Sequence, residues 1–305
     1  MSGVDPRTVE TAWRAVQFAR RAAEQAHRAA TQAAKAAAHR ERLLWDSPEA
    51  VAELRARVAA MNRRSEACQR TAERLLSNFA RRLERWAARE DAATLLRPVL
   101  MSEVARTAGW GGVVLTLRDG SGGEVLVAAS DDRARRVHEL AVALDEGPTV
   151  EAAQGCTSVA IGADMRRRWP RFGEMVGELG VRAVAAVPLD LGPRHAAGSL
   201  SAVGPPMPAH PGDLRGLRRV AQAIDEGVLR SSDLVCGADT QLPSLEMFEH
   251  EDFQPALHQA AGVLHERQAW DVDGAIALIR AHAYAENRSV AEVAEDVIAG
   301  RLWAD

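Results

Sequence analysis

The chain has 305 residues, enough for two or three domains of ordinary size, and 47% of them are hydrophobic. No apolar run reaches about 18 residues, so no membrane span is expected, and the start MSGVDPRTVE lacks the pattern of a signal peptide. Cys68, Cys156 and Cys236 stand far apart without a CxxC pair, which excludes a disulfide framework and fits reduced thiols in the cytoplasm.

The net charge of −4 is distributed unevenly along the chain. Residues 1–90 carry 18 Lys and Arg against 11 Asp and Glu, and residues 91–250 carry 16 against 21. Residues 251–305 carry only 4 basic residues against 10 acidic ones. The N-terminal part is therefore basic, and the C-terminal part is acidic.

Residues 1–90 are predicted to form a long helical hairpin. From Thr8 to Leu44 there is no Gly or Pro, and small apolar residues recur with the 4-3 spacing of a coiled coil. Ser47 is expected to cap a second helix with Pro48 as its first residue. A second heptad-like seam follows from Leu54 to Trp86, and Arg82 interrupts it. Two such seams predict a homodimer through this hairpin. Its positive charge is most simply a solvated flank, with nucleic-acid binding as the alternative.

Residues 91–232 change to the pattern of an α+β domain. Val113–Leu117 and Val125–Ala129 are rich in β-formers, with the hairpin loop RDGSGGE between them. A helix is expected from about Arg133 to Leu144, and two more strands lie in VRAVAAVPLD and AAGSLSAVG. A further helix is expected from about Gly212 to Ser231.

Three stretches of this middle region carry a resemblance: LDEGPTVEAAQG, WPRFGEMVGELGVRAVAAVPLDLG and AAGSLSAVG. Together they resemble a GAF domain of the actinobacterial kind. The resemblance implies a six-stranded antiparallel sheet with helices that senses a small molecule or signal, and it does not identify the ligand. We expect a pocket bounded by residues 144–160 and the strand at 181–187, because the small residues of VRAVAAVP leave room over the sheet.

Several residues of the middle region could suggest a cofactor, but each has a simpler interpretation. No chromophore-attachment signature surrounds Cys156, so we expect a buried or idle thiol. His138 and His195 are expected at the surface rather than as haem ligands. Asp145 to Pro148 is expected to be a turn that ends a helix, with a role at the pocket rim as the alternative.

Residues 233–250 lack periodicity and are interpreted as a linker. Residues 251–305 then predict three short helices. Leu257, Ala261 and Leu264 form one apolar face. Asp271 can cap a second helix, in which Ala275, Leu278, Ile279 and Ala283 are expected to face inward. In the third helix, Val290, Val293, Ala294 and Val297 repeat at helical spacing. Ser289 and Glu292 have the spacing of a capping box for the third helix. Gly262 costs roughly 1 kcal/mol within a helix relative to Ala, so we expect close helix contact or the close approach of a ligand backbone there.

The segments AAGVLHER, DVDGAIALIRAHAYAENRS and VAEVAEDVIAG resemble an ANTAR domain, the RNA-binding module of bacterial antitermination regulators. The resemblance implies binding to paired stem-loops with hexanucleotide loops, so that transcription reads through a terminator. A GAF domain followed by an ANTAR domain is a familiar pairing. Two positions depart from the family pattern, because Ala261 replaces the usual Lys and His265 the usual Met.

The acidic C-terminal segment cannot attract phosphate by bulk charge, so RNA recognition would need a local patch. The cations available for such a patch are Arg267, Arg280 and Arg288, while Asn287 can hydrogen-bond to base edges and Tyr284 can stack on an unpaired base. The predicted RNA-binding residues are Gly262, His265, Arg267, Arg280, Tyr284, Asn287 and Arg288. The alternatives to RNA binding are simpler. The arginines can lie on the solvated surface, and Tyr284 and Gly262 can serve in packing.

No motif or residue spacing indicates catalysis or a metal site. The expected architecture is therefore α+β: a helical hairpin (1–90), a GAF-like sensor (91–232), a linker (233–250) and an ANTAR-like three-helix bundle (251–305). We interpret the chain as a cytoplasmic, signal-responsive, dimeric antiterminator that binds RNA. The alternative is a sensor or interaction scaffold whose ANTAR-like head has lost RNA binding and acts through protein partners.

Overall fold

The structure is a computed structural model. It describes residues 6–43, 48–89, 91–92, 95–118, 124–189, 198–204, 214–229, 248, 255–268, 270–286, 288 and 290–303. The described chain divides into two compact units. One unit takes residues from 1–108 and 218–247, and the other takes residues from 109–217 and 248–305.

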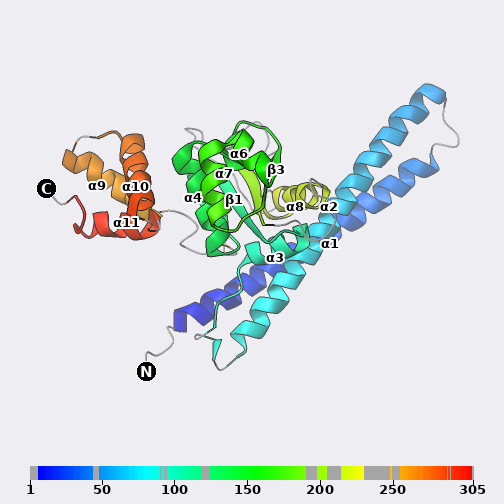
Figure 1. The fold of residues 1–305 in the computed structure, drawn as a ribbon. Helices are drawn as coiled ribbons and strands as arrows, with labels where there is room; N and C mark the ends of the chain where they lie inside the picture. Colours follow the sequence, from blue (N-terminus) through cyan, green and yellow to red (C-terminus); the bar gives the residue numbers. More distant parts are fainter. Residues whose placement is uncertain are drawn as a thin grey trace. The chain divides into compact units, whose positions relative to one another are not determined.

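Helices α1 (Pro6–Arg42) and α2 (Glu49–Ala87) form the predicted helical hairpin (Figure 1). Their interface is made of small side chains on α1 and larger ones on α2, as the 4-3 spacing indicated. The buried residues include Ala12, Val16, Ala19, Ala23, Ala26, Ala30 and Ala37 of α1, and Leu75, Leu76, Phe79, Ala80 and Leu83 of α2. Pro48 occupies the N-cap position rather than the first helical position, and Ser47 lies outside the described residues.

Two further helical segments pack against the hairpin within the first unit. Helix α3 (Leu100–Ala108) contacts α2, where its fully buried Glu103 receives ion pairs from Arg82 (3.3 Å) and Arg106. This contact explains why an arginine interrupts the apolar seam of α2. Ala223 of helix α8 (Arg215–Ile224) is buried in a cluster with Ala26, Cys68 and Ala72, and the π-helix η2 (Asp225–Leu229) follows α8.

The second unit contains an antiparallel sheet of five described strands in the order β2-β1-β5-β4-β3. The strands are β1 (Gly112–Arg118), β2 (Glu124–Ala129), β3 (Ser158–Ile161), β4 (Ala183–Leu189) and β5 (Gly198–Val203). Val114 of β1 pairs with Ala129 on one side and Ser201 on the other, which fixes the register of the central strands. The four strands predicted from the sequence are confirmed, β3 was not predicted, and residues 119–123 of the predicted hairpin loop lie outside the described residues.

Four helices accompany the sheet: α4 (Asp132–Leu144), α5 (Pro148–Ala153), α6 (Ala163–Arg168) and α7 (Pro170–Glu178). The Asp131 side chain caps α4 by accepting the N–H of Ala134 at 2.9 Å, and Asp145 ends the helix with a left-handed φ of 52°. Val181 and Val184 are buried in one core cluster with the larger side chains of α6 and α7, notably Met165, Trp169 and Phe172. The small residues Ala183, Ala185 and Ala186 of β4 are buried, and the predicted pocket over this strand stays a prediction.

The C-terminal helices α9 (Pro255–Gln268), α10 (Val272–Glu286) and α11 (Val290–Ile298) form the predicted three-helix bundle. Its core consists of Leu257, Ala260, Ala261, Leu264, Ala275, Ile279, Ala283, Val293, Ala294 and Val297. Asp271 caps α10, because its carboxylate accepts the N–H of Gly274 and its carbonyl accepts the N–H of Ala275. Leu278 and Val290, expected inside, are only partly buried at the edge of this core.

Candidate functional site

Gly262 lies on α9 next to the fully buried Ala261. Apart from its chain neighbours and the backbone of its own helix, a Cβ atom built on Gly262 would meet no atom of the described residues within 4 Å. The expectation of close helix contact at this glycine is therefore wrong, because the bundle leaves open space beside it. The other predicted reason, the close approach of a ligand backbone, stays a prediction.

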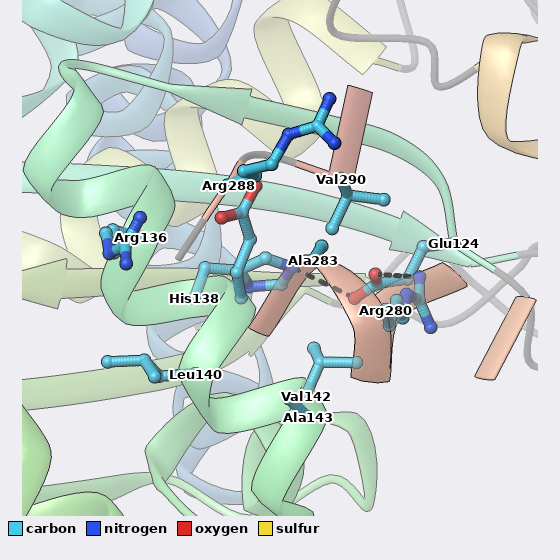
Figure 2. A pocket seen from close by; sticks show the side chains of 11 residues that line it. Glu124, Arg136, His138, Leu140, Val142, Ala143, Arg280, Ala283, Arg288 and Val290 are labelled. Carbon is cyan, nitrogen blue, oxygen red and sulfur yellow. Dashed lines mark hydrogen bonds and ion pairs between the residues drawn. The ribbon is translucent and has the colours of Figure 1, made fainter. Parts of the chain in front are cut away.

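Arg280 of α10 does not lie free on the surface of the bundle. Its Nη2 donates a hydrogen bond of 2.7 Å to Oε2 of Glu124, the first residue of β2. On α9, Nε2 of His258 lies 3.2 Å from the backbone carbonyl oxygen of the same Glu124. Figure 2 shows the ion pair between Arg280 and Glu124. Two helices of the bundle therefore contact a single residue of the sheet.

Glu124 is a buried carboxylate surrounded by two arginines, Arg118 and Arg280, and by His138. Its side chain is 3% exposed, and its Oε1 lies 3.3 Å from Arg118 and 3.1 Å from Nε2 of His138 on α4. Burial alone would raise the pKa of Glu124, but the charges of His138, Arg280 and Arg118 lower it to about 2. The carboxylate is therefore ionised at neutral pH and holds Arg280 as a charged partner.

His138 was predicted at the surface, and that prediction is wrong. Its side chain is 2% exposed and lies beside Glu124 at ion-pair distance, without the alignment of a hydrogen bond. It lines a cavity of about 30 Å³ together with Arg136, Arg280 and Arg288 (Figure 2). A cavity of this size holds one or two water molecules rather than an organic ligand, and such a water could satisfy the unbonded Nδ1 of His138.

Arg288 lies between α10 and α11 and is bound to carboxylates of its own bundle. Its guanidinium group forms ion pairs with Asp296 at 2.5 Å and with Glu286 at 3.2 Å. Hydrogen bonds from Arg288 and Arg301 lower the pKa of Asp296. Arg288 thus links the end of α10 to the last turn of α11, which favours a structural role.

Several exposed side chains of the bundle lie at the turn between α9 and α10. His265 and Arg267 are exposed, and Nδ1 of His265 lies 2.5 Å from the carbonyl oxygen of Trp270. Trp270 is 39% exposed and Val272 is 41% exposed. Sequence reasoning overlooked Trp270, although an aromatic residue outside the apolar periodicity of both helices was a usable signal.

The structure does not bring the predicted RNA-binding residues into one patch. Arg280 contacts the sheet domain, Arg288 is paired inside the bundle, and His265 and Arg267 lie at the α9–α10 turn. The side chain of Tyr284 and all of Asn287 and Ser289 lie outside the described residues. The predicted patch of Arg267, Arg280, Tyr284, Asn287 and Arg288 therefore stays a prediction.

The structure also describes two of the other sites considered in the middle region, Cys156 and the turn at Asp145. Cys156 is exposed rather than buried, and His195 lies outside the described residues. Glu146, after the turn at Asp145, accepts hydrogen bonds from the backbone of Arg171 and Phe172 and pairs with the Arg171 side chain at 3.0 Å. Within the described ranges, no group of three or more His, Cys, Asp or Glu side chains could hold a metal ion.

Comparison with protein families identifies the bundle. The family model of the ANTAR domain matches residues 254–298, which span α9 to α11. The C-terminal bundle is therefore an ANTAR domain. A search of curated proteins gave no match. None of the described helices is long and apolar enough to cross a membrane.

Proposed function

We propose that this protein is a signal-responsive RNA-binding antiterminator that recognises paired stem-loops with hexanucleotide loops. The observation that carries the proposal is the ANTAR match over a bundle with a closed apolar core. ANTAR domains serve as RNA-binding modules of antitermination regulators, so the bundle is the part of the chain that would read the transcript.

The RNA-reading surface is proposed to centre on the α9–α10 turn. Trp270 offers an exposed ring for stacking on an unpaired base, and Arg267 offers an exposed cation. Gly262 leaves open space along the same helix where an RNA backbone could approach. Tyr284 and Asn287 keep their proposed roles in stacking and base recognition. Because the segment has 4 basic and 10 acidic residues, this local chemistry matters more than bulk charge.

The sheet domain is proposed to act as the sensor, with Arg280 as its link to the RNA-binding bundle. While Arg280 donates to the buried Glu124, that carboxylate compensates the positive charge of its guanidinium group. A signal that weakens the contact at Glu124 would free this cation. The GAF resemblance supports the sensing role, and it does not identify the ligand.

The hairpin is proposed to form a homodimer. On α2, Val51, Leu54 and Met61 follow the heptad spacing of the buried seam, but they are 39%, 62% and 65% exposed. Farther along the same seam, Cys68 and Ala72 are buried in the cluster with Ala223. A second copy of the hairpin would cover the uncovered half of the seam.

A scaffold function is the second candidate, and one observation favours it. Arg280 and Arg288 are both paired with carboxylates, and Ala261 stands where ANTAR domains usually have a Lys. In this alternative, the bundle acts through protein partners and does not bind RNA.

An RNA titration separates the two functions. Full-length protein is mixed with a transcript carrying two hexaloop stem-loops and with a control whose loops are scrambled. An antiterminator binds the hexaloop transcript more tightly at both low and moderate salt. Equal affinity for the two transcripts would support the scaffold instead.

A further inference from the structure

The hairpin carries a basic groove that the ANTAR domain does not account for. Two adjoining open depressions, of about 710 Å³ along α1 and α2 and about 650 Å³ along α2 and α3, share Asn78 and Arg81. Their lining includes seven arginines against four glutamates. Among the described residues that line them, there is no Phe, Trp or Tyr.

Three arginines of this groove lie on one face of α2. Arg74, Arg81 and Arg85 are spaced by seven and four residues, which places them close to one line along the helix. At 1.5 Å of rise per residue, the steps between them are roughly 10 and 6 Å. All three are exposed, so their guanidinium groups form a row of positive charge along the groove.

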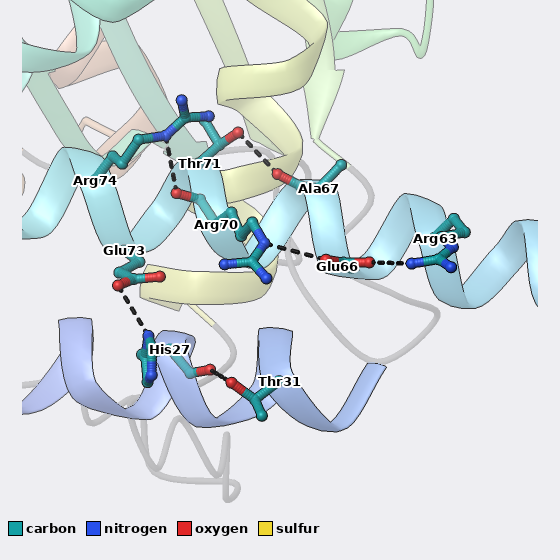
Figure 3. Close-up of polar contacts among 9 residues, drawn as sticks. All are labelled: His27, Thr31, Arg63, Glu66, Ala67, Arg70, Thr71, Glu73 and Arg74. Atoms are coloured by element: carbon teal, nitrogen blue, oxygen red, sulfur yellow. Dashed lines mark hydrogen bonds and ion pairs between the residues drawn. The ribbon is translucent and has the colours of Figure 1, made fainter. Parts of the chain in front are cut away.

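Within the described part of the chain, these three guanidinium groups bond to neutral oxygens. Nε of Arg74 donates to the carbonyl of Arg70 at 3.2 Å, as Figure 3 shows, and Nε of Arg85 donates to the carbonyl of Arg81 at 3.2 Å. Arg81 donates to the side-chain oxygen of Asn78. Their positive charges are therefore not cancelled by a carboxylate.

Other arginines of the same groove are neutralised. Arg20 pairs with Glu84 at 2.6 Å, and Arg82 and Arg106 share the buried Glu103. His27 lies 3.0 Å from Glu73, as Figure 3 shows. The groove thus combines a structural set of ion pairs with a row of cations that is free to bind an anion.

We propose that the row of Arg74, Arg81 and Arg85 binds the phosphate backbone of the RNA whose loop the ANTAR domain reads. Guanidinium groups match phosphate oxygens in geometry, and the absence of Phe, Trp and Tyr among the described lining residues favours backbone contact over base stacking. The charge distribution favours phosphate binding at the hairpin rather than at the ANTAR segment. Residues 1–90 have 18 basic against 11 acidic residues, whereas the ANTAR segment has 4 against 10. The inference rests on the proposed RNA-binding function and supplies the cations that the ANTAR domain lacks.

The test compares two double variants of the full-length protein. R74Q/R81Q removes two charges from the groove, whereas R57Q/R64Q removes two exposed charges from the same helix outside it. Affinity for the hexaloop and scrambled-loop transcripts is measured over a range of salt concentrations. Circular dichroism melting confirms that both proteins are folded, and R28Q/R85Q repeats the test at other positions of the groove.

R74Q/R81Q should bind both transcripts about tenfold more weakly than R57Q/R64Q, and the slope of log affinity against log salt should fall by about 1.5. The preference for hexaloops should not change, because phosphate contacts carry no sequence information. Equal affinities and slopes for the two double variants would overturn the inference, as would a wild-type protein that binds neither RNA. If the wild type binds both transcripts equally and R74Q/R81Q weakens both, the proposed loop recognition by the ANTAR domain is refuted. The proposed phosphate binding by the groove is then still supported. A change in oligomeric state in R74Q/R81Q without a change in RNA binding would mean that the groove binds an acidic protein surface instead.

Discussion

Replacing Glu124 with Gln tests the contact between the sheet domain and the ANTAR domain. Gln keeps the size of the side chain but removes the charge that Arg280, Arg118 and His138 surround. The pKa of Glu124 is lowered from 4.5 to about 2, and each pH unit corresponds to about 1.4 kcal/mol. The charged form therefore contributes about 3 kcal/mol to stability, and E124Q should lose an amount of that order.

The pH dependence has a definite sign. Because the pKa of Glu124 is lower in the folded state, its stabilisation is fully present above about pH 4.5 and is lost as the pH falls toward 2. Urea unfolding of wild type and E124Q should therefore differ most near neutral pH and converge in acid. Glu178→Gln, an exposed change in the same unit, serves as the control and should leave stability nearly unchanged. Equal unfolding free energies for E124Q and wild type at pH 7 would refute this account of the buried carboxylate.

Three further predictions concern the ANTAR domain and the hairpin. Gly262→Ala should raise the unfolding free energy by up to about 1 kcal/mol in urea unfolding, because the added Cβ meets no described atom outside its own helix within 4 Å, and a loss of stability would show that the glycine is needed for packing. Trp270→Ala should weaken hexaloop binding about ten- to a hundredfold in the RNA titration with an unchanged salt slope, and an unchanged affinity would exclude stacking at Trp270. Leu54→Glu with Met61→Glu should turn a dimer into a monomer in light scattering, and a dimer that persists would locate the interface elsewhere.

Local sequence patterns predicted the helices in which apolar residues recur over several turns. The 4-3 spacing of alanines predicted α1, because a helix buries the side chains that recur on one face. The same reasoning predicted most of the ANTAR core, and the capping chemistry of Asp271 located the start of α10. By contrast, β3 and α5 to α7 are four to nine residues long, too short for a clear period.

The contact at Glu124 could not be predicted from local patterns. His138 follows Glu124 by 14 residues and Arg280 by 156, so only the tertiary fold brings the three side chains together. The pattern around His138 gave no sign that its face of α4 would be buried. At Gly262 a local rule predicted a tertiary contact that the fold does not have. The cost of glycine in a helix suggested close helix contact, and the described residues of the bundle do not make that contact.

The measurement that tests the central claim most directly is the affinity of wild type and E124Q for hexaloop and scrambled-loop transcripts under the same salt conditions. An ANTAR domain that reads RNA loops under the control of the sheet domain should bind the hexaloop transcript at least about tenfold more tightly than the control. E124Q should bind it more tightly than wild type, because Arg280 is released from its buried partner. Equal affinity for the two transcripts in both proteins would contradict the claim.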